Sequence, residues 1–169
     1  HATPTDRVLQ EGDLRLIDWG ASFAGTFSDI TRSFFCGDPN NEMKRIASLV
    51  EKANAAARLG GRAGMPAGEV DRLARDVVTE AGYGDYFTHR TGHGLGMEAH
   101  EPPYIYQGNP LILESGMVFT IEPGVYLPGK YGVRIEDDVV VEDEGLRSLT
   151  DLPRKVMRPT DFLVAAQKE

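Results

Sequence analysis

The sequence predicts an α+β domain in which a curved, largely antiparallel sheet is backed by two helices. Strand-like apolar and aromatic runs lie at residues 14–35 and 117–149. Between them, apolar residues recur at helical spacing from Glu42 to Leu59 and from Gly68 to Ala81. The chain has 169 residues, of which 41% are hydrophobic, which is enough for one core. We therefore expect one domain over residues 1–169.

In the first half of the chain, strands are expected from Leu14 to Phe35. The segment Cys36-Gly37-Asp38-Pro39-Asn40-Asn41 is a turn and helix-entry signal that leads into the first helix. Gly60-Gly61 ends that helix, and a loop through Gly64-Met65-Pro66 leads to the second helix, which ends at Gly82.

The second half of the chain is predicted to be mostly strands. Met117 to Leu127 alternates partly between apolar and polar residues. A second run from Val133 to Glu142 continues into Leu146 to Leu149 across Glu144-Gly145, which is a hairpin signal. The tail after Pro159 is either a loose end or a short helix.

Composition excludes several classes of function. The net charge of −8 and pI of about 5.0 disfavour nucleic acid as a partner, because phosphate binding needs a basic surface. No apolar run approaches the ~20 residues that span a bilayer. Cys36 is the only cysteine, and we interpret it as a small apolar filler in a reducing compartment, not as a catalytic thiol. The chain begins at His1, so we expect it to have been cut from something longer.

Carboxylates and imidazoles cluster in four segments where folding alone does not require them. The segments are Asp18-Trp19-Gly20; Ser28-Asp29-Ile30-Thr31-Arg32; His89 to Gly96 with His100-Glu101-Pro102-Pro103; and Ile121-Glu122-Pro123-Gly124 with Arg134-Ile135-Glu136-Asp137-Asp138.

Four carboxylates in these segments, Asp18, Asp29, Glu122 and Glu136, lie beside apolar residues in strand-like runs. A buried carboxylate is costly unless it is paired or bound to a metal, and converging carboxylates repel one another. Divalent cations relieve that repulsion. Four carboxylates and one imidazole suit a pair of Mn, Co, Zn or Fe ions, which would bring the pKa of a bridging water towards ~7.

Each of these features also has an ordinary structural explanation. A run such as Glu136-Asp137-Asp138 is usually a solvated strand edge, and a lone histidine is usually a hydrogen-bonded structural residue. Gly92, Gly94 and Gly96 give the backbone freedom to turn sharply beside His93. A phosphate cradle is disfavoured because the run lacks the lysine and the serine or threonine of a P-loop.

At these same residues the sequence resembles the metallopeptidases that include methionine aminopeptidase, aminopeptidase P and prolidase, which share the pita-bread (creatinase/aminopeptidase-like) fold. The intervals from Asp18 to Asp29, to His93, to Glu122 and to Glu136 are 11, 64, 29 and 14 residues. The last interval resembles the proline-specific branch more than methionine aminopeptidase. The matching segments are Asp18-Trp19-Gly20, Ser28 to Arg32, Gly92 to Gly96, Thr120 to Gly124 and Val133 to Asp137, in the family's order, and His100-Glu101-Pro102-Pro103 resembles the prolidase version.

The resemblance implies a role for each matching residue. Asp29 and Glu136 would bridge two divalent metal ions, with Mn or Co expected and Zn or Fe as alternatives. The implied metal ligands are Asp18, Asp29, His93, Glu122 and Glu136.

The resemblance also implies catalytic residues. Glu122 would act as general base or proton shuttle. His100 would hydrogen-bond the substrate carbonyl and stabilise the oxyanion. His1 would lie on the substrate side of the site. Arg134 would hold a substrate carboxylate or position Glu122 by charge-assisted hydrogen bonds.

The sequence departs from the family in one respect: the strand and helices that would precede His1 and form half of the sheet are absent. We therefore expect a C-terminal catalytic domain that is a fragment of a longer enzyme. Activity of the isolated fragment is in doubt, because surrounding residues position metal ligands.

The function implied is hydrolysis of a peptide bond before proline, as in an Xaa-Pro dipeptidase, through a hydroxide bridging two metal ions. Aminopeptidase P is the nearest alternative, followed by a creatinase-like small-amide hydrolase, which retention of all five ligand positions disfavours. A metal-free binding module is a fourth reading. The resemblance implies a small peptide substrate, no nucleic-acid or membrane partner, and a cytoplasmic homodimer.

Overall fold

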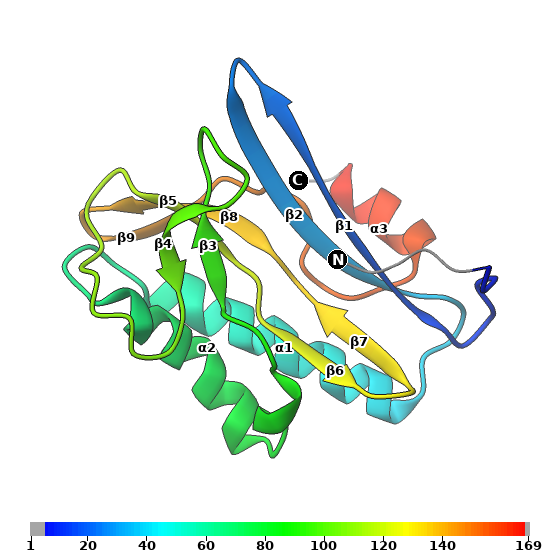
Figure 1. Ribbon diagram of the computed structural model, residues 1–169. Coiled ribbons are helices and arrows are strands. Elements are labelled where there is room, and N and C mark those ends of the chain that lie inside the picture. The colour runs from blue at the N-terminus through cyan, green and yellow to red at the C-terminus, as the bar shows by residue number, and fades with distance from the viewer. Residues whose placement is uncertain (1–5, 168–169) are drawn as a thin grey trace.

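A computed structural model describes residues 6–167 of the chain (Figure 1). Hydrogen bonding divides its strands into three antiparallel sheets. The first is a long hairpin of β1 (Leu14–Phe23) and β2 (Thr26–Phe35). The second has the order β4-β3-β5-β8-β9, and the third pairs β6 with β7. The bounds are β3 (Gly92–Gly94), β4 (Glu101–Ile105), β5 (Val118–Ile121), β6 (Gly124–Leu127), β7 (Tyr131–Arg134), β8 (Asp137–Glu142) and β9 (Gly145–Ser148).

Helices α1 (Asn41–Gly60) and α2 (Ala67–Glu80) lie together on one face of these strands (Figure 1). Asn40 begins α1 because its side chain accepts a hydrogen bond from the backbone N–H of Met43. The apolar stripes of both helices are fully buried against strand residues in one continuous core. This core includes Ile46, Val50, Ala53, Val70, Ala74, Phe119, Ile121 and Val139.

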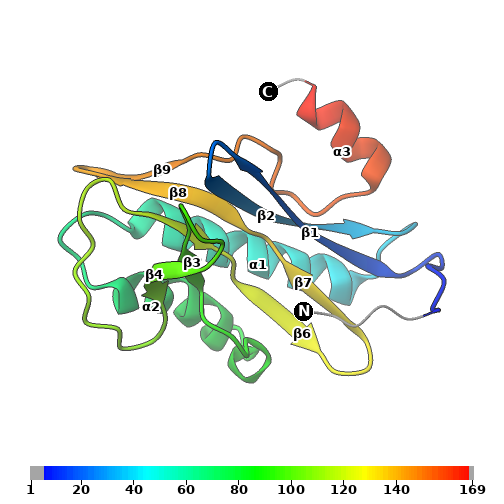
Figure 2. The same cartoon turned by 45° about the horizontal axis from the view of Figure 1, so that its top comes forward.

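The β1–β2 hairpin turns at Ala24 and Gly25, which both have positive φ, 51° and 83°. Such a turn matches the twist of paired strands. An antiparallel bridge between Thr31 and Glu136 connects the hairpin to the rest of the molecule. A short helix, α3 (Pro159–Ala166), covers the other end of the hairpin, where the ring centroids of Phe34 and Phe162 lie 5.1 Å apart (Figure 2).

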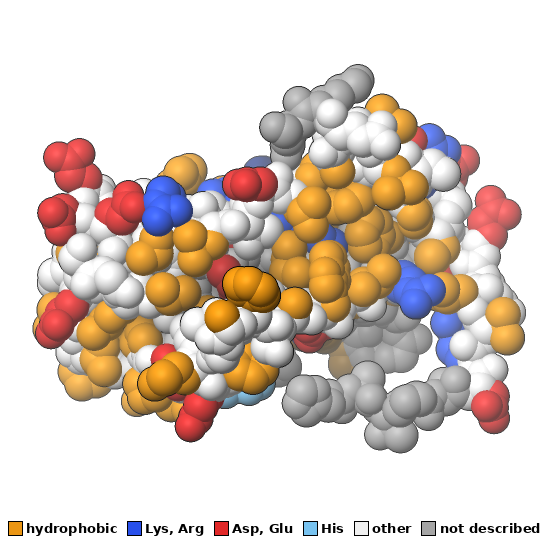
Figure 3. All heavy atoms as spheres, turned by 90° about the horizontal axis from the view of Figure 1, so that it is seen from above, with side chains coloured by type: hydrophobic (Ala, Val, Ile, Leu, Met, Phe, Trp, Pro, Cys, Tyr) orange, Lys and Arg blue, Asp and Glu red, His pale blue; other side chains and the backbone are white. Residues whose placement is uncertain are grey.

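One face of the hairpin has no covering element within residues 6–167. Most of β1 is exposed, and the exposed large hydrophobic residues of the hairpin include Ile17, Trp19 and Phe23 on β1 and Phe27 on β2. Viewed from above, hydrophobic side chains gather on this side of the molecule (Figure 3). Exposed apolar area of this kind marks a surface on which other protein packs.

The predicted helices match the structure to within one residue at each end. The expected curved sheet is divided into three hydrogen-bonded units, because β6 and β7 pair only with each other and the hairpin joins the rest through two isolated bridges, Thr31–Glu136 and Phe34–Met157. The tail forms the short helix α3. The final hairpin turns at Asp143-Glu144, one residue earlier than expected. Strands β3 and β4 were not predicted.

No helix among the described residues is long and apolar enough to cross a membrane.

Candidate metal centre

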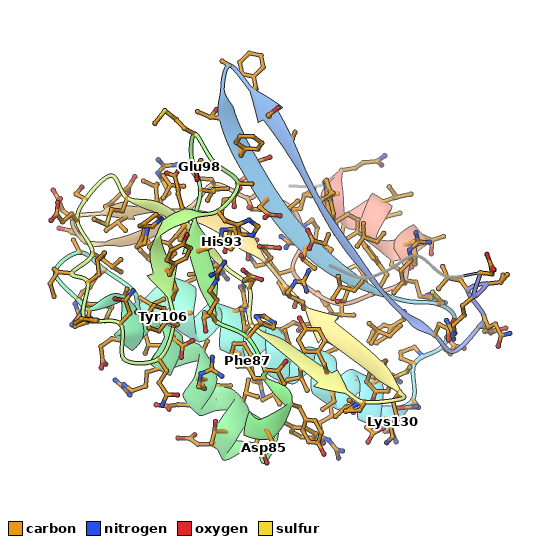
Figure 4. The ribbon with its side chains drawn as sticks, in the orientation of Figure 1. Asp85, Phe87, His93, Glu98, Tyr106 and Lys130 are labelled. Atoms are coloured by element: carbon orange, nitrogen blue, oxygen red, sulfur yellow. The ribbon has the colours of Figure 1, made fainter. Side chains whose placement is uncertain are left out.

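Acidic and imidazole side chains from β1, β2, β3 and the segments around Glu122 and Glu136 line one cleft of about 1190 Å³. The side chain of His93, a residue of β3, points towards the β1–β2 hairpin (Figure 4). Three overlapping groups of side chains have possible ligand atoms within 4.8 Å of one another. They are Asp29, His93 and His100; His93, Glu122 and Glu136; and Asp18, Asp29 and Glu136. The structure thus brings all five predicted ligands and His100 together.

His93 is held with one ring nitrogen turned to the carboxylates. Its Nδ1 lies 3.0 Å from the carbonyl oxygen of Gly94, which can only accept, so Nδ1 carries the proton. Nε2 is then unprotonated and has a free lone pair. This nitrogen lies 3.4 Å from Glu122 Oε1 and 3.8 Å from Asp29 Oδ2. A neutral imidazole in this tautomer can bind a metal ion through Nε2.

The glycines around His93 serve close packing and not the sharp turn that we expected. Neither Gly92 nor Gly94 has a positive φ. A Cβ at Gly92 would lie 1.8 Å from the carbonyl oxygen of Thr120, and one at Gly94 would lie 2.3 Å from that of Pro102. Only glycine therefore lets β5 and β4 approach β3 closely enough to hold His93.

Glu136 and Asp29 are fixed by neighbours that are not themselves predicted ligands. Thr31 Oγ1 donates to Glu136 Oε2 at 2.5 Å. The backbone N–H of Asp29 donates to Asp138 Oδ2 at 3.0 Å. Asp138 Oδ1 is the one buried side-chain polar atom without a partner among the described residues. Asp138 therefore supports the site, although sequence reasoning assigned it no role.

Arg134 contacts Asp18 more closely than Glu122. Its Nη2 donates to Asp18 Oδ2 at 2.5 Å, whereas its Nε lies 3.9 Å from Glu122 Oε2. Nη1 donates to the Tyr126 hydroxyl at 3.0 Å, and that hydroxyl lies 2.8 Å from His89 Nε2. Arg134 therefore belongs to a chain of side chains that ends at Asp18, and it does not hydrogen-bond Glu122.

Sequence reasoning assigned no role to three residues that line the cleft: His89 and Arg90, which lie in one of the four segments, and Tyr126. His89 and Arg90 lie four and three residues before the glycine-flanked His93, and that proximity was an available signal. Tyr126 gave no signal, because its contacts with His89 and Arg134 depend on the fold of β6 and β7.

Burial corrects one sequence-based interpretation and excludes one alternative. Asp18 was interpreted as a carboxylate that is costly to bury, but its side chain is 48% exposed because β1 has no cover on that face. Burial also excludes the ordinary explanation of Glu136-Asp137-Asp138 as a solvated edge, because all three residues are buried. His1 lies outside the described residues.

Burial shifts the protonation of the site towards neutral forms. It raises the pKa of Glu122 to about 7 and that of Asp138 to about 7. It raises the pKa of Glu136 well above its usual range, with the charge of Glu122 adding to the effect. Burial lowers the pKa of His93 to about 4. Buried, mutually repelling carboxylates beside a neutral imidazole are a donor set that divalent cations fit.

We predict that the metal-free fold loses stability between pH 6 and pH 8. Glu122 and Asp138 have folded-state pKa values of about 7, above their ordinary 4.5 and 3.8, so their contribution is complete at low pH and is lost as pH rises through 7. Each of the two groups lowers the free energy of unfolding by roughly 1 kcal/mol between pH 6 and pH 8. His93 acts in the opposite direction, because at pH 6 the unfolded imidazole binds a proton that the folded one, with a pKa of about 4, does not. Its contribution rises by less than about 1 kcal/mol towards pH 8 and only partly offsets the loss from the two carboxylates.

Urea unfolding in EDTA at pH 6 and pH 8 measures this effect. Saturating Mn²⁺ should remove most of the pH dependence, since the cations replace the missing protons. A metal-free stability that is flat or rises over this window would contradict the assignment of buried, uncompensated carboxylates.

Comparison with known proteins gives one family match and close relatives. The sequence profile of metallopeptidase family M24 matches residues 1–143. A probable dipeptidase PepE of Mycobacterium tuberculosis is 44% identical over 158 residues, which cover 93% of this chain and 42% of the relative.

Solved structures give the same result. A prolidase from Thermococcus sibiricus matches with a TM-score of 0.91 and 47% identity, over 94% of this chain and 43% of that protein. An X-Pro aminopeptidase from Thermotoga maritima matches with a TM-score of 0.90 and 42% identity, over 94% of this chain and 44% of that protein. The chain spans less than half the length of these relatives. The likeness confirms the predicted α+β pita-bread fold.

Proposed function

The chain belongs to metallopeptidase family M24, and on this premise we propose that the protein uses two divalent cations to hydrolyse the peptide bond before proline in Xaa-Pro dipeptides. The observation that carries the proposal is the convergence of five donor side chains from separate segments in one cleft. Mn or Co are the proposed cations, with Zn or Fe as alternatives. The ligands would be Asp18, Asp29, His93, Glu122 and Glu136.

When bound, such cations supply Lewis acidity and a water molecule of lowered pKa. The chain's own residues would do the rest. A Glu122 carboxylate oxygen would take the proton of the attacking water and pass it to the leaving amine. His100, exposed at the rim of the cleft, would donate a hydrogen bond to the substrate carbonyl oxygen. Arg134 would orient Asp18 through their hydrogen bond.

The position of Arg90 is evidence that the substrate carries a free carboxylate. It is half-buried and lines the cleft, and its guanidinium carbon lies 4.7 Å from the centroid of the Tyr104 ring. No Asp or Glu among residues 6–167 forms an ion pair with it, unlike Arg134, which is paired with Asp18. An unpaired guanidinium near the reacting centre is a receptor for a carboxylate. In an Xaa-Pro dipeptide the proline carboxylate lies only a few bonds from the scissile amide.

The test is hydrolysis of Ala-Pro and of Ala-Pro-amide by the full-length protein with added Mn²⁺ or Co²⁺. We predict that the wild type prefers the free acid and that Arg90→Met reduces this preference roughly tenfold to a hundredfold. Arg62→Met, at an exposed arginine away from the cleft, is the matched control and should keep the wild-type ratio.

The same assay separates the alternatives. Efficient cleavage of Ala-Pro-Yaa tripeptides together with poor cleavage of Ala-Pro would favour aminopeptidase P activity, which the likeness to the Thermotoga enzyme keeps as the second candidate. No cleavage of any of these substrates with any of the cations would overturn the proposed function.

We also propose that the chain is the C-terminal catalytic part of a longer protein, and that further residues of that protein cover β1. The exposed apolar face of β1 and the coverage of 42% and 43% of its relatives support this proposal. A homodimer and a cytoplasmic location are proposed on the family resemblance alone.

A further inference from the structure

A buried charged network lies directly behind the candidate metal centre. Successive side chains of a strand point to opposite faces, so Glu136 and Asp138 face the site while Asp137 faces α1. Asp137 is fully buried. Its Oδ1 accepts from Arg32 Nη2 at 2.7 Å, and its Oδ2 accepts from Arg154 Nε at 2.8 Å and from Asn54 Nδ2 at 3.0 Å. One carboxylate thus joins β2, α1 and the segment before α3.

Arg32 has all five N–H donors engaged although its side chain is only 2% exposed. Besides Asp137, it donates to four backbone carbonyl oxygens. Nη1 donates to Thr31 at 2.9 Å and to Glu136 at 2.6 Å. Nη2 donates to Leu152 at 3.0 Å, and Nε donates to Pro153 at 2.8 Å. The guanidinium is therefore locked in one orientation.

Two of those carbonyl oxygens belong to Thr31 and Glu136, which connect the hairpin to the rest of the molecule at the metal centre. Thr31 and Glu136 form one of the two bridges between the hairpin and the rest of the molecule, with Glu136 N–H donating to Thr31 O at 3.1 Å. The Thr31 hydroxyl in turn holds the Glu136 carboxylate. Arg32 thus holds the backbone at both Thr31 and Glu136. Asp29 lies two residues before Thr31 on β2, so this contact also sets the position of Glu136 relative to Asp29.

We propose that Arg32 and Asp137 are positioning residues for the metal centre, which set the separation of Glu136 and Asp29 and thereby the affinity for the cations. The proposal rests on the proposed function. Stability alone is a weak explanation of such a pair, because replacing buried ion pairs with apolar residues is often neutral or stabilising. Residues that hold metal ligands in place typically change metal affinity about tenfold to a hundredfold.

The experiment measures Mn²⁺ affinity of the full-length protein by competition with a fluorescent chelator. The variants are Arg32→Lys, which keeps the charge but loses the five-donor fork, and the double variant Arg32→Met/Asp137→Leu. The double variant removes both charges of the pair and also takes the Asp137 carboxylate from Arg154 and Arg58. Arg72→Lys and Arg72→Met/Asp76→Leu are matched controls, since Arg72 and Asp76 form an exposed ion pair of 3.0 Å on α2. Circular dichroism selects the folded variants, and Arg32→Lys provides the measurement if the double variant does not fold.

The expected result is Mn²⁺ binding weakened tenfold or more in the Arg32 variants and unchanged in the controls. A metal-free readout accompanies it: in EDTA the amide hydrogen of Glu136 should exchange faster in the Arg32 variants. Folded Arg32 variants that bind Mn²⁺ within twofold of the wild type would overturn the positioning role while leaving the proposed function intact. A wild type that binds none of Mn²⁺, Co²⁺, Zn²⁺ and Fe²⁺ would overturn both.

Discussion

Replacing Glu136 or Asp29 with alanine is expected to lower kcat/KM for Ala-Pro by more than about a hundredfold, which is the upper range for losing a residue that merely supports a ligand. Both carboxylates belong to two of the three groups with ligand atoms within 4.8 Å. Removing either one therefore takes a donor from both proposed cation positions. Full activity in either variant would refute the assignment.

Unfolding does not explain such a loss at Glu136. Its buried carboxylate has a pKa far above the usual range, so its ionised form opposes folding at neutral pH when no metal is bound. Alanine there should leave the metal-free protein at least as stable at pH 8. Asp143→Ala, in the exposed turn between β8 and β9, is the control and should keep wild-type activity.

Replacing Glu122 with glutamine is the second large effect, with an expected loss of kcat on the order of a hundredfold to ten-thousandfold. Glutamine keeps the shape and one oxygen donor, but it cannot take a proton from water. The carboxylate that it replaces accepts from Thr120 Oγ1 at 3.3 Å and lies 3.4 Å from His93 Nε2, so it is held at the centre of the cleft.

Steady-state kinetics at saturating Mn²⁺ measure this effect, because saturation separates proton transfer from weakened metal binding. Glu142→Gln, at an exposed glutamate paired with Arg147, is the matched control. If Glu122→Gln keeps more than a tenth of the wild-type kcat, another group moves the proton.

The elements that the sequence predicted well are those encoded locally. The period of apolar residues and the capping signals located α1 and α2 to within one residue. Strands β3 and β4 escaped prediction because β3 has only three residues, two of them glycines. Those glycines are explained by contacts with Thr120 and Pro102 on neighbouring strands, which no local pattern contains.

The candidate site was likewise predictable only where the information is local in the sequence. Residue types and spacing identified the set of carboxylates and His93, but not their surroundings. A solvated edge stayed open as an alternative for Asp137, because the arginines that pair with its carboxylate, Arg32 and Arg154, lie 105 and 17 residues away. Asp18 was interpreted as buried because its apolar neighbours suggested a core strand, whereas β1 is mostly exposed.

The most direct test of the central claim is an anomalous-difference map from crystals of the protein soaked in Mn²⁺. We predict two manganese peaks in the cleft, with carboxylate oxygens of Asp29 and Glu136 within bonding distance of both and with Asp18, His93 and Glu122 completing the ligands. A map without peaks in this cleft, or with these five side chains turned away from the manganese, would contradict the account.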